Sequence, residues 1–236
     1  MSTATSNNFS NLFEFTELTP RTKDHLNQVY GTLSIGCLCA AATCMWTPAF
    51  VVDNFWFMLL SIIGTIGLVL TMFAKKGNQD HGTKFLCFLG VTCITGAGLR
   101  PLMDLATEID PTIIINALLY TGVIFGSFTF ASLKTRRRSM LFIGGFCGSI
   151  MLGLAVTMLS SWIFGLSLIS YFAYNVITLV VFSLYVIYDT QLIVEKACLG
   201  DFDYCIHALE LFIDMVKIFT KIVKILIILS DKKKSD

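Results

Sequence analysis

Charged residues are scarce in this chain of 236 residues: Asp, Glu, Lys and Arg make up 14% of it, and 55% of the residues are hydrophobic. A soluble domain carries about 25% charged residues, so this composition excludes an ordinary soluble protein and indicates an integral membrane protein. The net charge is only +1, which gives no support for a nucleic-acid partner. The first 28 residues contain no hydrophobic run, so we expect no cleavable signal peptide.

Long hydrophobic runs are plentiful, and seven windows approach or exceed the roughly 20 apolar residues that a membrane span needs. No charged residue occurs from residue 139 to residue 188, a stretch too long for one span. We divide it at 160–165, where serines, Trp162 and Gly165 are typical of an interfacial turn. The predicted spans are 29–45, 54–74, 85–103, 111–133, 140–160, 167–194 and 206–229.

The predicted fold is therefore all-α, an integral membrane protein with seven transmembrane helices. Residues 1–28 are predicted to be a cytosolic tail, 29–229 a multi-helix membrane domain and 230–236 a basic C-terminal tail. The first window is short, the third contains Arg100 and the last is amphipathic. Six spans followed by an interfacial or re-entrant last helix is therefore an open alternative.

Basic residues in the short loops predict the orientation, because Lys and Arg accumulate on the cytosolic side. With the N-terminus in the cytosol, the outside loops hold at most Arg100. The inside loops then hold Arg21, Lys23, Lys75, Lys76, Lys84, Lys134, Arg136, Arg137, Arg138 and Lys196. The cluster Lys232, Lys233 and Lys234 would fall outside if the last helix spans the membrane fully, so the side of the C-terminus stays open.

Two small-residue patterns, Gly122 with Gly126 and Gly144 with Gly148, predict close helix packing. Gly64, Gly67, Gly96 and Gly98 in the second and third windows are expected to act in the same way. The eight cysteines form no Cys-x-x-Cys pair and no histidine cluster accompanies them, so we predict neither a metal site nor a bound cofactor.

The last window carries ionisable residues at steps of three and four, which places them on one face of a helix. Apolar side chains surround this stripe. A membrane-length helix keeps such groups only where they face a bundle interior, a partner charge or water, so this helix is the predicted functional element. The stripe consists of His207, Glu210, Asp214, Lys217, Lys221 and Lys224.

Asp189 ends the uncharged run of the sixth window, and a short connection leads from there to the last helix. The two helices are expected to be antiparallel neighbours, with Asp189 and Asp214 differing in depth by about 4.5 Å. Two carboxylates in contact in a low-dielectric site share one proton, so the pair is predicted to be a proton-responsive latch. Alternatively, Asp189 caps a helix end and Asp214 pairs only with Lys217.

Several stretches of the chain are similar to the transmembrane Bax inhibitor motif family, with the Bax inhibitor-1 branch as the nearest. The most specific match is Tyr188-Asp189-Thr190-Gln191-Leu192-Ile193, followed by Leu209-Glu210-Leu211-Phe212-Ile213-Asp214. Further matches are Thr19-Pro20, Thr95-Gly96-Ala97-Gly98-Leu99-Arg100-Pro101, Arg136-Arg137-Arg138 and the terminal lysines.

The resemblance implies a membrane protein of the endoplasmic reticulum that suppresses cell death and lets calcium leak from the store, more readily in acid. It also implies a last helix that is central and wrapped by six others, with Asp189 and Asp214 as the pH-sensitive latch. Bacterial relatives place an arginine on the second helix near this pair, whereas 54–74 has no basic residue. Lys217 or Arg100 can substitute for it, or the latch has no cationic member.

The leading functional hypothesis is a pH-gated calcium leak in which Glu210 and Asp214 line a polar path, because carboxylates are oxygen ligands suited to calcium as the permeant ion. The second is an interaction protein that restrains Bcl-family apoptosis regulators without conducting ions. Lys232, Lys233 and Lys234 would contact membrane lipids or such a partner. His207 is read as an interfacial histidine, with a second pH sensor as the alternative.

An enzymatic function is the least supported hypothesis, and we predict no catalytic residue. Tyr188-Asp189 fits half of the signature of presenilin-type aspartyl proteases. The other half is missing, because Asp214 is not preceded by Gly-x-Gly and no Pro-Ala-Leu follows it.

Overall fold

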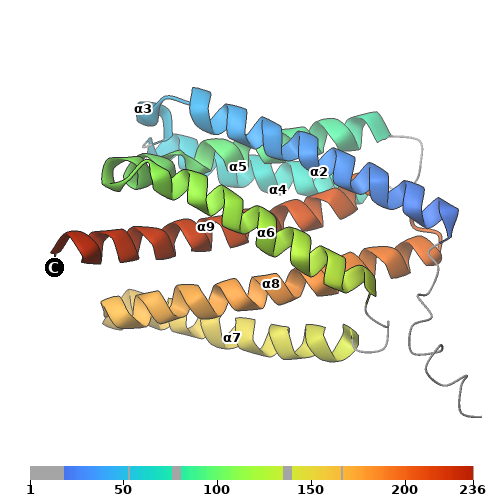
Figure 1. Cartoon of the computed structure of the whole chain (residues 1–236). Helices are drawn as coiled ribbons and strands as arrows, with labels where there is room; N and C mark the ends of the chain where they lie inside the picture. Colours follow the sequence, from blue (N-terminus) through green and yellow to red (C-terminus); the bar gives the residue numbers. More distant parts are fainter. Residues whose placement is uncertain (1–18, 53, 76–80, 135–139, 166, 236) are drawn as a thin grey trace, which may run out of the picture.

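The structure is a computed structural model that describes residues 19–52, 54–75, 81–134, 140–165 and 167–235. Over these residues the chain forms eight helices, so the all-α class is confirmed (Figure 1). The helices are α2 (Pro20–Trp46), α3 (Ala49–Val52), α4 (Phe55–Ala74), α5 (His81–Ile109), α6 (Thr112–Lys134), α7 (Met140–Phe164), α8 (Leu168–Cys198) and α9 (Tyr204–Ser235).

Six of the described helices are long and apolar enough to cross a membrane: α2, α4, α5, α6, α7 and α8. Their outward faces carry large apolar side chains, among them Leu38 and Ile169, which are 72% and 82% exposed. Such a surface is stable against lipid and not against water. The protein is therefore an integral membrane protein. Helix α9 is outside this set because ionisable residues recur along it at every third or fourth position.

Local sequence explains where the helices begin and break. The Thr19 hydroxyl accepts a hydrogen bond from the Thr22 amide at 3.3 Å, and Pro20 occupies the first turn of α2, where an amide proton is not needed. Helix α2 thus starts well before residue 29, where the predicted span begins. A helix can extend past the hydrocarbon, so the predicted division into tails and membrane domain stays a prediction.

The predicted break in the long uncharged run is confirmed. Helix α7 ends at Phe164, and Gly165 has a φ of +70°, a conformation that favours glycine. Ser167 then caps α8 by accepting a hydrogen bond from the Ser170 amide at 3.2 Å. The chain therefore turns back here, and α7 and α8 pack against each other.

Helix α9 lies in the interior of the bundle and packs against α8, α2, α6 and α5 (Figure 1). Helix α4 makes its main contacts with α5, and α7 makes its main contact with α8. The last helix is therefore enclosed mainly by four helices, and α4 and α7 form an outer layer. This differs from the expected enclosure by six, since α4 and α7 pack chiefly on other helices.

Glycine packing agrees with the sequence prediction at Gly96 and Gly144 and differs from it at other glycines. A Cβ at Gly96 would lie 2.2 Å from the carbonyl oxygen of Ala40, so only glycine allows α5 to approach α2 so closely. At Gly144 a Cβ would lie 2.6 Å from the Tyr188 ring. Gly122 and Gly126 have nothing within 4 Å of that position, and the same is true of Gly67 and Gly98, so the close packing predicted at these four glycines is wrong.

The described helix ends divide between the two ends of the bundle (Figure 1). The start of α2, the ends of α4 and α6 and the α8–α9 turn lie at one end, and the C-terminal end of α9 lies at the other. Arg21, Lys75 and Lys196 belong to the first end. The helix ends that carry basic residues thus lie together, as the prediction from the basic loops requires. The basic residues within 76–80 and 135–139 lie outside the described residues.

Candidate functional site

Asp189 of α8 and Asp214 of α9 meet inside the bundle. Their carboxyl groups approach within hydrogen-bonding reach of each other. Asp214 is only 4% exposed, and its Oδ2 is buried without a hydrogen-bond partner among the described residues. The turn at 199–203 makes the two helices antiparallel, which brings residues 25 positions apart to a similar depth. The predicted contact is therefore present, and the pair joins two neighbouring helices.

A second link between the same helices lies nearer the turn. Lys196 of α8 donates from Nζ to Oε1 of Glu210 at 2.9 Å and to Oε2 at 3.3 Å. Glu210, predicted to line a path or provide a counter-charge, is thus paired with a lysine that the sequence placed only in a loop. The Lys196–Glu210 pair and the two aspartates therefore lie along the same contact between α8 and α9.

Two basic groups act on the aspartate pair: the charge of Lys217 acts on both carboxyl groups, and that of Lys196 acts on Asp189. The Nζ of Lys217 lies 4.7 Å from the centre of the Phe182 ring on α8, a cation–π contact. The alternative in which Asp189 caps a helix end and Asp214 pairs only with Lys217 does not describe this arrangement, because the two carboxyl groups also interact with each other.

Arg100 is not brought to the aspartates. Its Nε lies 2.8 Å from Oδ1 of Asp104, and its Nη1 donates to the carbonyl oxygens of Cys44 and Met45 at 3.2 and 3.0 Å. It therefore caps the C-terminal end of α2, where helix carbonyls need donors. A counter-charge role for Arg100 at the aspartate pair is not supported by this placement.

The polar stripe of α9 continues with a contact that the sequence did not predict. Lys221 donates from Nζ to Oδ1 of Asn175 at 3.3 Å and lies 4.6 Å from the centre of the Tyr174 ring. Both partners are on α8, so the stripe faces a neighbouring helix rather than lipid. Lys232 and Lys233 are exposed at the end of α9, and the Lys234 side chain lies outside the described residues.

His207, near the start of α9, is buried within the bundle with 1% exposure, and it meets His25 of α2, which is 3% exposed. Nε2 of His25 and Nδ1 of His207 lie 2.9 Å apart, so one ring donates and the other accepts. The Phe202 ring packs edge-on against His25, with centroids 5.4 Å apart. Sequence reasoning missed this pair because 182 positions separate the two histidines and no local spacing relates them.

Three hydroxyl groups from different helices lie close to one another inside the bundle. They belong to Tyr30 of α2, Thr129 of α6 and Thr190 of α8. All three oxygens are buried without a well-formed hydrogen bond. Within the described ranges no group of three or more His, Cys, Asp or Glu side chains is arranged to hold a metal ion. The site therefore consists of paired charges and hydroxyls within a helical bundle.

These features define a class, the polytopic helical membrane proteins that keep ionisable groups inside the bundle. A family model described as "Inhibitor of apoptosis-promoting Bax1" matches residues 22–231. The chain is 39% identical over 230 residues to Bax inhibitor 1 of Bos taurus, which covers 96% of each chain. It is 38% identical over 231 residues to probable Bax inhibitor 1 of Paralichthys olivaceus, with 96% of this chain and 94% of that protein covered.

Bax inhibitor 1 of Homo sapiens is 35% identical over 230 residues, covering 97% of this chain and 96% of the human protein. The chain belongs to the Bax inhibitor-1 family, as the resemblance in the sequence predicted. This family of multi-pass membrane proteins inhibits apoptosis and is not a family of enzymes. The intramembrane protease hypothesis therefore has no further support.

Proposed function

We propose that this protein is a pH-sensitive calcium leak of the endoplasmic reticulum membrane that restrains apoptosis, with Asp189 and Asp214 as its latch. One observation carries the proposal: two carboxyl groups from neighbouring helices contact each other in the bundle interior. Two such groups cannot both ionise cheaply in a low dielectric, so one proton is shared between them. The pair then holds α8 and α9 together through a charge-assisted hydrogen bond.

The latch responds to acid through its proton count. A second proton removes the negative charge and with it the strong hydrogen bond, so α8 and α9 can separate. Glu210 and the protonated Asp214 then line the path between these helices. The Glu210 carboxylate and the carbonyl oxygen of the neutral Asp214 carboxyl group coordinate calcium transiently. Lys217 limits the affinity by placing a positive charge beside them. We assign the larger leak to acidic pH because the family resemblance implies a calcium leak that increases in acid.

We further propose that α9 is the seventh transmembrane helix, with the N-terminus in the cytosol and the C-terminus on the opposite side. At 1.5 Å per residue its 32 residues extend about 48 Å, which exceeds the roughly 30 Å of hydrocarbon. Its charges do not oppose insertion, because Glu210, Asp214 and Lys221 face partners on α8. Exposed Lys232 and Lys233 would then contact lipid headgroups.

The test is calcium influx into dye-loaded liposomes that contain only the purified protein, measured between about pH 5 and 8. We expect influx to rise in acid for the natural sequence. Asp189→Asn and Asp214→Asn should each give a flatter pH profile, because an amide cannot gain or lose the shared proton. Asp231→Asn is the matched control, since this exposed aspartate on α9 is distant from the pair. Equal pH profiles for all four proteins would refute the latch.

The second candidate function is an interaction protein that restrains Bcl-family regulators without conducting ions. The name of the matching family, an inhibitor of apoptosis-promoting Bax, favours it. The same liposomes separate the two functions, because they contain no partner protein. No influx above empty liposomes at any pH would reject the leak and leave the interaction protein.

A further inference from the structure

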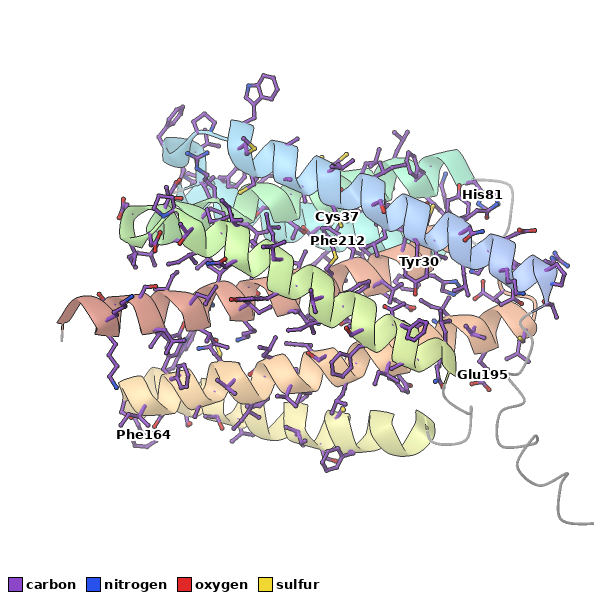
Figure 2. All side chains as sticks on the ribbon, viewed as in Figure 1. Tyr30, Cys37, His81, Phe164, Glu195 and Phe212 are labelled. Atoms are coloured by element: carbon purple, nitrogen blue, oxygen red, sulfur yellow. The ribbon has the colours of Figure 1, made fainter. Side chains whose placement is uncertain are left out.

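A cavity of about 540 Å³ lies between α2, α5 and α6, with α9 as its floor. Its walls include Cys37 and Ala41 of α2, Leu118 of α6 and Phe212 and Met215 of α9. Cys37 and Phe212 both line the cavity, and both are labelled near the middle of the bundle in Figure 2. Helices α2 and α6 are not closely packed against each other, which leaves this space between them. Its volume is in the range of about 300–1,000 Å³ that encloses small ligands.

The cavity opens sideways, toward the surroundings of the helices. Its rim includes Met45, which is 80% exposed, and Leu118, which is 59% exposed. Ala41 and Gly122 at the rim are exposed as well. These faces belong to two helices that are apolar enough to cross a membrane, so they meet lipid. An apolar space of this kind stays free of water but accepts hydrocarbon.

One end of the cavity is polar, because Arg100 and Asp104 line it. The guanidinium group of Arg100 donates from Nε to Asp104 and from Nη1 to carbonyl oxygens of α2. Nη2 takes no part in these hydrogen bonds. Trp46, 88% exposed at the end of α2, is typical of the membrane interface and puts this pair near the headgroup level. The end of the cavity thus offers one cation and one anion side by side.

We propose that this cavity binds one acyl chain of a zwitterionic phospholipid. The chain lies along Met215 and the rest of the α9 wall, the phosphate accepts a hydrogen bond from Nη2 of Arg100, and the headgroup ammonium lies against Asp104. We choose a zwitterionic rather than an anionic phospholipid because of charge complementarity: an anionic lipid would offer no cation to Asp104. The bound chain would cover the face of α9 that looks away from α8.

The test uses phosphatidylcholine with a photoreactive diazirine in one acyl chain, mixed into vesicles that contain the purified full-length protein. Mass spectrometry then locates the crosslinks. We expect crosslinks on Met215 and Phe219 at the cavity floor, in addition to outward-facing residues such as Val123. Crosslinks confined to outward-facing residues would overturn the proposal.

Gly122→Phe is the matched blocking variant, because a side chain there projects into open space and fills the cavity. Gly126→Phe, one turn further along α6 with equally open surroundings and outside the cavity lining, is the control. Crosslinks to Met215 should be lost in the first variant and kept in the second. Equal crosslinking of Met215 in both would refute the site. Ala41→Phe fills the same space from α2 and replaces Gly122→Phe if thermal unfolding shows that variant to be misfolded.

The headgroup part is tested separately with Asp104→Asn, which leaves Arg100 with an unbalanced positive charge. Floor crosslinks from photoreactive phosphatidylglycerol should increase relative to those from phosphatidylcholine. An unchanged ratio between the two lipids would overturn the zwitterionic assignment.

Discussion

At the scale of single residues, the ion pair of Lys196 and Glu210 accompanies the aspartate contact between α8 and α9. Both side chains are 29% exposed, so solvent screens the pair and we expect a coupling energy of about 0.5–1 kcal/mol. Lys196→Gln and Glu210→Gln should therefore each destabilise the protein, and the double variant should lose less than the sum. Thermal unfolding in detergent micelles measures this cycle, and strictly additive losses would show that the pair contributes nothing.

Gly96 gives a second prediction at this scale. Gly96→Ala places a methyl group against the Ala40 carbonyl oxygen, so α2 and α5 must move apart and unfolding should become easier by about 1–3 kcal/mol. Gly98→Ala is the control, because a Cβ there meets nothing within 4 Å. The melting temperatures of the two purified variants test this; similar values for both would contradict the close approach.

At the scale of whole helices, the start of α9 is attached to two other elements. The His25–His207 hydrogen bond connects it to α2, and Lys84 of α5 forms an ion pair with Asp203 in the turn before α9. These contacts orient the helix before it reaches the aspartate pair. The sequence showed the amphipathic stripe of α9 but not these long-range partners.

The histidine link predicts a coupled loss of stability. His25→Phe and His207→Phe each remove one member of a buried hydrogen bond and leave the other ring unsatisfied, so each should cost about 1–3 kcal/mol. The double variant should cost little more than either single one, since both remove the same bond. Thermal unfolding of the three variants decides this, and a double loss equal to the sum would mean that the rings act independently.

At the scale of the whole molecule, the two ends of the described chain lie at opposite ends of the bundle. If α9 crosses the membrane, a thiol at residue 231 and the exposed Cys198 in the last turn of α8 must face opposite sides. In sealed microsomes an impermeant maleimide should label Cys198 of the natural sequence from the cytosol. The variant Cys198→Ser with Asp231→Cys should be labelled only after the membrane is opened. Labelling of residue 231 in sealed microsomes would show that α9 does not span.

The sequence by itself determined the class of the protein and the face of α9 that carries the ionisable side chains. Scarce charge and long apolar windows predicted the helices, because lipid permits only structures that satisfy the backbone internally. The break at 160–165 was predictable because glycine and serine act locally. Asp189 and Asp214 could be paired from depth alone, since a short turn fixes two antiparallel neighbours.

The tertiary structure alone decided which helices enclose α9 and which partner each charged group has. Glu210 binds Lys196, Arg100 caps α2, and His207 meets His25. It also decided that Gly122 borders a cavity rather than a tight helix contact. The reason is physical: periodicity fixes only the face on which a side chain lies. The group it meets depends on how helices distant in sequence pack together.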